Sequence, residues 1–125
     1  MKRILILLML TFCLTKTHSQ KHIFSFDKQN FLLDNKPVQL ISGEMHPARI
    51  PYIYWQHRIQ MAKAMGCNTI AIYVFWNYHE LTNGKFDFKT ENRNIAEFIR
   101  LCKKEKMWVL LRPGPYVCAE WDFGG

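Results

Sequence analysis

An α/β fold built on a parallel sheet is the fold class that the sequence predicts, and three observations lead to this prediction. Two near-continuous apolar runs, NTIAIYVFW at residues 68–76 and MWVLLR at residues 107–112, are typical of strands buried on both faces. Segments with apolar residues at helical spacing precede each of them. No linker, internal repeat or low-complexity stretch interrupts the order of strand, helix, strand, helix, strand, which is the pattern of parallel α/β folds.

The segment IFSFDKQNFLLDNKPVQLISG, residues 23–43, contains the first elements of this order. It places two apolar runs around a turn at Asp34 to Pro37, and its alternation of apolar and polar residues predicts a short β-hairpin. We expect this hairpin to lead into the first strand of the sheet, near Val38 to Ile41.

Each predicted helix carries signals at its ends. Pro51 stands at the start of the first helix, where a missing N–H is tolerated, and Gly66 lies beyond its end, where a left-handed backbone is favoured. Asn94 and Glu97 have the spacing of a capping box at the start of the second helix. The apolar stripes are Trp55, Ile59, Ala62 and Met65 in the first helix, and Ile95, Phe98, Ile99 and Cys102 in the second.

Polar and aromatic residues follow the carboxyl end of every predicted strand. A nucleotide-binding doubly wound sheet would carry a glycine-rich phosphate loop after its first strand, and the sequence has no such loop. Function at the carboxyl end of each strand is typical of the (β/α)8 barrel, so we favour the barrel over the doubly wound sheet. The three clusters are Glu44 and His46, then Tyr73, Trp76, Asn77, His79 and Glu80, and finally Arg112, Tyr116, Glu120 and Trp121.

Residues 1–19 are predicted to be a signal peptide. A basic start precedes an apolar run of about eleven residues, which is too short to span a bilayer. Thr17 and Ser19 have the spacing of a signal-peptidase site, so the mature domain is expected to span residues 20–125. Cys13 would suggest a lipoprotein, but the residue before it is not small. We expect a secreted or periplasmic protein, lysosomal if it is eukaryotic, without a membrane attachment after cleavage.

The composition of the remaining chain excludes some classes of protein. It holds 14 basic and 10 acidic residues, with no basic run or stripe, so we expect no nucleic-acid partner. Its three cysteines, Cys67, Cys102 and Cys118, give no disulfide framework and no spacing that suggests a metal site. Cys67 and Cys102 are predicted to be small core residues, because free cysteine is among the most buried residue types.

Carboxylates that alternate with Trp and Tyr at the mouth of a barrel favour a carbohydrate ligand. A carboxylate accepts hydrogen bonds from two neighbouring sugar hydroxyls with charge-assisted strength. The sequence has neither the HExxH spacing of a zinc site nor the nucleophile elbow of a serine hydrolase.

Several of these residues also fit structural roles. Trp76 and Trp121 fit plain packing equally well, and Glu44 and Glu80 fit roles in orienting the backbone or in pairing with Arg49, Arg58 or Arg112. For His79, a hydrogen-bonded structural histidine is favoured over a general base. Arg112, which precedes a proline, is expected to anchor a loop or neutralise a site carboxylate. Glu120 is the strongest candidate for function, because the rigid PGPY turn before it directs the side chain and no lysine lies nearby in the sequence.

Four ordered motifs, SGEMHPARIP, YVFWNYHE, NGKFDF and RPGPYVCAEWDFGG, closely resemble the N-terminal catalytic region of glycoside hydrolase family 35, the β-galactosidases. The resemblance runs from about Phe31 to Gly125. It implies a (β/α)8 barrel, of which this chain would hold about three βα units, and release of terminal β-linked galactose with retention and without a cofactor. By the same resemblance, Tyr73 and Glu120 contact galactose hydroxyls, and backbone atoms of Val117, Cys118 and Ala119 line the same pocket.

The resemblance also limits what this chain contributes to catalysis. From the residues alone, Glu80 and Glu120 would be the acid and the nucleophile, but in the family the catalytic glutamates follow the fourth and seventh strands. A retaining pair stands roughly 5–5.5 Å apart across the scissile bond. We therefore expect no catalytic residue in this chain, the pair C-terminal to Gly125, and a truncated barrel that is inactive alone.

Two positions depart from the family's pattern. Pro47 stands where an aromatic residue is common, and Leu81 where a proline usually follows the His-Glu pair. The expected partner is a galactoside or a galactose-containing glycan. Two alternatives stay open, namely a catalytically inactive secreted sugar-binding remnant and a related β-glycosidase of different sugar specificity.

Overall fold

The computed structural model describes residues 21–121, which belong to two compact units divided between Gln39 and Leu40. The predicted signal peptide, residues 1–19, lies outside the described residues.

The first unit is a small antiparallel sheet with the strand order β1-β2-β3. Its strands are β1 (Phe24–Phe26), β2 (Phe31–Leu33) and β3 (Lys36–Val38). Asp34 and Asn35 form the turn between β2 and β3 with φ values of 52° and 63°. Asp and Asn are favoured at such positive φ values in two-residue hairpin turns, so the predicted hairpin is confirmed.

The second unit contains a parallel sheet with the order β4-β5-β8. Its strands are β4 (Ser42–Glu44), β5 (Thr69–Tyr73) and β8 (Trp108–Arg112). The prediction of a strand near Val38 to Ile41 is wrong, because β3 ends at Val38 and β4 begins at Ser42. The backbone N–H of Ile41 instead donates to the Asn68 side chain at 2.9 Å, and this residue belongs to the connection between β3 and β4.

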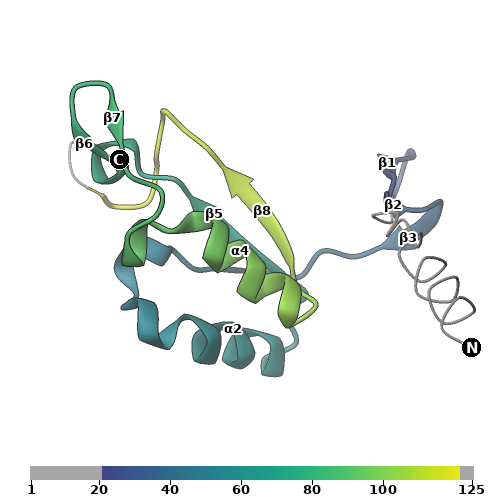
Figure 1. Cartoon of the computed structure of the whole chain (residues 1–125). Coiled ribbons are helices and arrows are strands. Elements are labelled where there is room, and N and C mark those ends of the chain that lie inside the picture. The colour runs from purple at the N-terminus through teal and green to yellow at the C-terminus, as the bar shows by residue number, and fades with distance from the viewer. Residues whose placement is uncertain (1–20, 122–125) are drawn as a thin grey trace, which may run out of the picture. The chain divides into compact units, whose positions relative to one another are not determined.

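Helices α2 (Trp55–Ala64) and α4 (Ile95–Lys104) connect the parallel strands and lie on the same face of the sheet (Figure 1). The signals at the end of α2 and at the start of α4 are found in the structure. Gly66 follows α2 with a φ of 93°, and the Asn94 side chain accepts a hydrogen bond from the Glu97 N–H at 3.0 Å. The α/β class is therefore confirmed for this unit.

Two details of the first predicted helix are wrong. Pro51 precedes a short 3-10 helix, η2 (Tyr52–Tyr54), and α2 begins only after it. Met65 is 80% exposed, because α2 ends at Ala64 and the chain turns away before the next position of the apolar stripe reaches the core.

The core lies between the two helices and the sheet. Phe98 is fully buried and packs edge-on against Trp55, with ring centroids 5.2 Å apart. Cys102 is fully buried, as predicted, and burial raises the pKa of its thiol to about 12. Cys67 is half-buried at the edge of this core. The buried core residues are Trp55, Ile59, Ala62, Ile70, Ile72, Ile95, Phe98, Cys102 and Met107.

Strand β8 is less buried than its apolar run predicts. Trp108, Leu110 and Leu111 are 42–45% exposed, since among residues 21–121 the strand pairs with β5 along one edge alone. The loops at the carboxyl ends of the strands hold further short elements. They are the 3-10 helices η1 (Pro47–Arg49) and η3 (Glu91–Arg93), the helix α3 (Trp76–His79) and a hairpin of β6 (Glu80–Thr82) and β7 (Lys85–Phe86).

Candidate functional site

The face of the parallel sheet that points away from α2 and α4 carries polar residues at its carboxyl end. Ile70 and Ile72 of β5 point into the helical core, so by strand alternation Tyr73 points to the opposite face. Tyr73 is paired in register with Arg112, and Glu44 with Ala71. Three predicted site residues from three strands therefore share one face.

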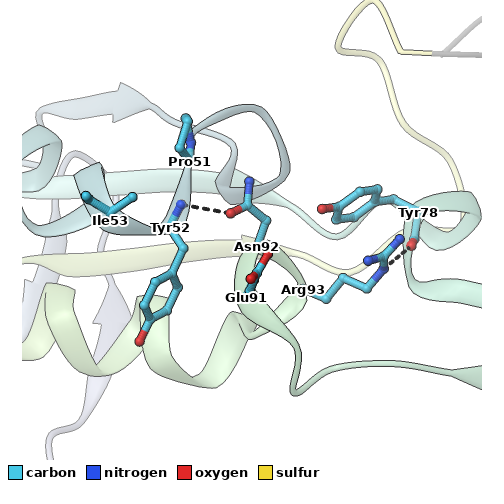
Figure 2. A pocket seen from close by; sticks show the side chains of 7 residues that line it. All are labelled: Pro51, Tyr52, Ile53, Tyr78, Glu91, Asn92 and Arg93. Carbon is cyan, nitrogen blue, oxygen red and sulfur yellow. Dashed lines mark hydrogen bonds between the residues drawn. The ribbon is translucent and has the colours of Figure 1, made fainter.

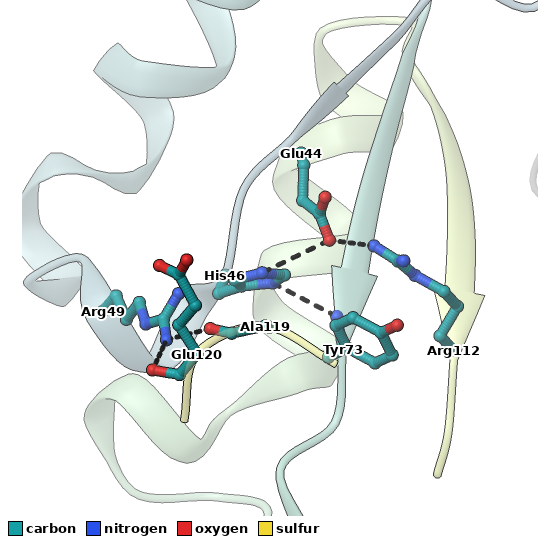
Figure 3. A network of polar contacts seen from close by, with 7 residues as sticks. All are labelled: Glu44, His46, Arg49, Tyr73, Arg112, Ala119 and Glu120. Atoms are coloured by element: carbon teal, nitrogen blue, oxygen red, sulfur yellow. Dashed lines mark hydrogen bonds and ion pairs between the residues drawn. The ribbon is translucent and has the colours of Figure 1, made fainter. Parts of the chain in front are cut away.

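Glu44, Arg112 and Tyr73 form one contact group on this face (Figure 3). The Arg112 guanidinium donates from Nη2 to Glu44 Oε1, and its central carbon lies 3.8 Å from the centroid of the Tyr73 ring. Of the structural roles considered for Glu44, the structure shows the pairing with Arg112. The Arg112 guanidinium therefore covers one face of the Tyr73 ring and restricts the side-chain rotamers of Tyr73.

His46 contacts both Glu44 and Tyr73 and is only 8% exposed. Its Nε2 is 3.4 Å from Glu44 Oε1, and the Tyr73 N–H donates to its Nδ1 at 3.4 Å. Burial lowers the pKa of His46 and outweighs the opposite effect of the Glu44 carboxylate. The imidazole is therefore neutral near pH 7 and acts as a hydrogen-bond acceptor for the end of β5.

The loop of residues 113–121 is fastened beside these strands by Arg49, at the end of η1. Its Nη2 donates to the backbone carbonyl oxygen of Ala119 and, at 2.8 Å, to that of Glu120 (Figure 3). Trp121 stacks on Phe75 with centroids 4.3 Å apart and an interplanar angle of 11°. These contacts bring the loop that carries Glu120 to the carboxyl ends of β4 and β5.

The 113–121 loop carries four of the predicted substrate residues, Val117, Cys118, Ala119 and Glu120. Glu120 has a φ of 51°, in the left-handed region. Cys118 is exposed, and its thiol forms a hydrogen bond with the Tyr116 hydroxyl. That bond and the neighbouring Tyr73 raise the pKa of Tyr116, which places these groups in one local environment.

The two tryptophans of the predicted clusters have packing partners. The Trp121 Nε1–H donates to the Asn77 side chain at 2.9 Å, in addition to the stack on Phe75. Trp76 is 45% exposed, and its Nε1–H donates to the Pro113 carbonyl oxygen. Both indoles thus fasten the 113–121 loop, in line with the packing interpretation.

His79 and Glu80 stabilise local structure away from this group. His79 is 1% exposed, its Nδ1 lies 2.9 Å from the Asp87 carbonyl oxygen, and its ring stacks on Phe88. Burial lowers its pKa. The Glu80 carboxylate accepts the Gly84 N–H at 2.6 Å in the β6–β7 turn. The structural interpretation of His79 and the backbone-orienting role of Glu80 are confirmed.

A hollow of about 430 Å³ lies between η2 and η3, and it contains none of the predicted site residues (Figure 2). Two of its polar side chains, those of Asn92 and Arg93, are engaged in local bonds. The Tyr52 N–H donates to Asn92 Oδ1 at 2.8 Å, and Arg93 Nε donates to the Tyr78 carbonyl oxygen at 2.9 Å. Its lining is Pro51, Tyr52, Ile53, Tyr78, Glu91, Asn92 and Arg93.

Sequence reasoning missed the role of Arg49 and Phe75 in this site. Phe75 is 1% exposed and looks like the end of a buried strand in the sequence. The sequence suggests Arg49 only as a partner for a glutamate side chain, whereas in the structure its guanidinium donates to backbone carbonyl oxygens. Its place within the motif SGEMHPARIP, just after the first parallel strand, was the available signal.

Residues 21–121 contain neither a cluster of metal-ligating side chains nor a helix able to span a membrane. Within this range no three His, Cys, Asp or Glu side chains gather closely enough to hold a metal ion. The helices of the same range are too short and too polar to cross a membrane.

Fold and site together define an α/β protein whose candidate site combines carboxylates and aromatic rings at the carboxyl ends of parallel strands. The sequence model of glycosyl hydrolases family 35 matches residues 30–125. The chain belongs to this family.

Several characterised relatives are similar to it. A β-galactosidase from Xanthomonas manihotis is 47% identical over 102 residues, which cover 82% of this chain and 17% of the relative. β-Galactosidase from Mus musculus is 44% identical over 100 residues, with 80% and 15% covered. β-Galactosidase from Homo sapiens is 40% identical over 129 residues, with 98% and 19% covered. The chain thus spans less than a fifth of the length of these relatives.

Proposed function

We propose that residues 20–125 are the N-terminal part of the catalytic (β/α)8 domain of a β-galactosidase. Such an enzyme is a retaining glycoside hydrolase that releases terminal β-linked galactose. The family membership and the names of the relatives support this proposal. The observation that favours it most within the chain is the position of the Glu120 loop, which Arg49 fastens beside the carboxyl ends of β4 and β5.

The proposed role of this region is to bind the sugar rather than to cleave the bond. Glu120 accepts hydrogen bonds from galactose hydroxyls, and Tyr73 contributes a further contact from the end of β5. Backbone atoms of Val117, Cys118 and Ala119 line the same pocket. The catalytic glutamate pair is contributed by other parts of the full-length protein, and the reaction needs no cofactor.

The proposed setting follows from the leader. Residues 1–19 direct the protein to the secretory route and are removed after Ser19, which gives a secreted or periplasmic enzyme, or a lysosomal one in a eukaryote. There the protein meets galactosides or galactose-containing glycans as its substrate.

Chromogenic glycosides test the function in the full-length protein. We expect hydrolysis of nitrophenyl β-galactoside, with β-galactose as the first product by NMR. Faster hydrolysis of a β-glucoside or β-glucosaminide would show that the enzyme prefers a sugar other than galactose. Galactose binding without hydrolysis of any glycoside would instead favour a sugar-binding protein.

Substitution of Glu120 tests the site. Glu120→Gln keeps the shape and removes the charge and one acceptor, and hydrogen bonds to charged groups contribute roughly 1.5–3 kcal/mol. The kcat/KM should therefore fall by about 10- to 150-fold, at about 1.4 kcal/mol per decade. Azide should not restore activity to Glu120→Gly. Strong azide rescue would make Glu120 catalytic, and activity within about twofold of the parent would make it structural.

A further inference from the structure

We propose that Arg49 is a positioning residue that sets the orientation of the Glu120 carboxylate, and this inference rests on the proposed sugar-binding role of Glu120. Arg49 lies on η1, some seventy residues before the loop that it contacts. Its side chain is exposed and does not belong to the buried core. The contact is therefore separate from the packing that holds α2 and α4 on the sheet.

The two acceptors of Arg49 fix the backbone on both sides of Glu120. The carbonyl of Ala119 belongs to the peptide group before the Cα of Glu120, and the carbonyl of Glu120 belongs to the peptide group after it. One guanidinium nitrogen, Nη2, donates to both oxygens. Because each peptide group is planar, these bonds restrict φ and ψ of Glu120, and with them the direction in which its side chain leaves the backbone.

The conformation that is held in this way is an unfavourable one for glutamate. Glu120 has a φ of 51°, and left-handed backbone disfavours residues that carry a Cβ. Without the two hydrogen bonds, the loop would relax toward other backbone conformations and carry the carboxylate away from the sugar. A strained backbone conformation persists only where contacts with the surrounding structure hold it in place.

An aromatic platform positions Arg49 itself. The central carbon of its guanidinium lies 5.3 Å from the ring centroid of Trp121 and 5.7 Å from that of Phe75. These two rings are stacked on each other, and Phe75 is 1% exposed, so the platform is anchored in the unit. A planar guanidinium stacks on aromatic rings while it donates, whereas the ammonium of lysine is a point charge on a flexible stem.

The test compares Arg49→Lys and Arg49→Met with Arg58→Lys in the full-length protein. Arg58 is an exposed arginine of α2 and serves as the matched control. Loss of hydrogen bonds to a charged donor predicts a fall in kcat/KM of about 10- to 100-fold for both Arg49 variants. The control should stay within about twofold of the parent, and kcat/KM within twofold for the Arg49 variants would overturn the proposal.

A double substitution separates positioning from an unrelated structural effect. If Arg49 acts through the Glu120 carboxylate, Arg49→Lys should add less than about twofold to the loss caused by Glu120→Gln. Independent, multiplicative losses in the double variant would refute the positioning role.

Hydrogen exchange gives a readout that does not depend on activity. Peptides covering residues 113–121 should exchange about tenfold faster in Arg49→Lys than in the parent, and at the parent's rate in Arg58→Lys. Unchanged exchange in Arg49→Lys would overturn the inference. If exchange of the 113–121 loop depends on Arg49 as expected but the parent protein does not hydrolyse galactosides, the proposed function is overturned, while the inference that Arg49 holds the loop stands.

Discussion

Substitution of Gly114 by alanine should damage the 113–121 loop, the proposed sugar-binding loop, in two ways. Gly114 has a φ of 84°, and the left-handed region costs an L-residue about 1–2 kcal/mol. A Cβ at this position would lie 2.8 Å from Nε1 and 3.0 Å from Cδ1 of Trp76, which is closer than van der Waals contact. Trp76 would have to move, with loss of its hydrogen bond to Pro113, and a neutral hydrogen bond contributes about 0.5–1.5 kcal/mol.

Gly84→Ala provides a matched control for this prediction. Gly84 has a similar φ of 75° in the β6–β7 turn, but a Cβ there would meet no atom within 4 Å. Both variants carry the backbone cost, and Gly114→Ala alone carries the collision. We expect Gly114→Ala to lower local stability by about 2–3 kcal/mol in total and Gly84→Ala by about half of that.

The assay measures kcat/KM and the temperature of half-inactivation in the full-length protein. Gly114→Ala should reduce kcat/KM by about tenfold or more, because the loop carries Glu120, whereas Gly84→Ala should leave it within about twofold. Equal effects of the two variants on both quantities would show that the contact with Trp76 has no consequence, and would refute the reasoning.

Three further predictions concern other parts of the chain. Glu44→Gln removes the charge that accepts from Arg112; exposed ion pairs contribute about 0.2–1 kcal/mol, so kcat/KM should fall by no more than about fivefold, and a loss above about 100-fold would make Glu44 catalytic. Burial lowers the pKa of His79 in the folded protein below the 6.5 of the unfolded chain, so as the pH falls the unfolded chain binds a proton at this imidazole before the folded protein does. The free energy of unfolding therefore has its full value above pH 6.5 and decreases as the pH falls below it. The melting temperature should therefore drop less between pH 7.5 and pH 5.5 in His79→Gln than in the parent, and equal drops would contradict this (both pH values are about one unit from 6.5). Mass spectrometry of the exported protein should find Gln20 as the first residue; retained Met1 or a lipid on Cys13 would contradict the predicted cleavage.

The sequence was sufficient to predict the elements whose signals are local. Gly66 marks a helix end through its positive φ, and the Asn94 side chain marks one by accepting from the Glu97 N–H within the same turn; the structure shows both. The first parallel strand was misplaced by a few residues, because its position depends on the bond between Ile41 and Asn68, which are 27 residues apart. Short strands without an apolar run carry little signal of their own.

The candidate site was predictable as a set of residues but not as a set of contacts. The clusters after each strand contain Glu44, Tyr73 and Arg112, and the parallel register brings them to one face. The attachment of Arg49 to the Ala119 and Glu120 carbonyls spans 70 and 71 residues and involves backbone acceptors, which every residue possesses. No pattern of side chains in the sequence distinguishes those two carbonyls from others.

Because Cys102 is buried, its reaction with an alkylating reagent reports on separation of α4 from the sheet. A thiol with a pKa of about 12 has almost no thiolate at neutral or mildly alkaline pH, and the thiolate is the form that reacts with alkylating reagents. Cys118, by contrast, is exposed. A pulse of iodoacetamide should therefore modify Cys118 in the native protein and reach Cys102 only when α4 separates from the sheet, so the rate of modification at Cys102 measures how often that helix undocks.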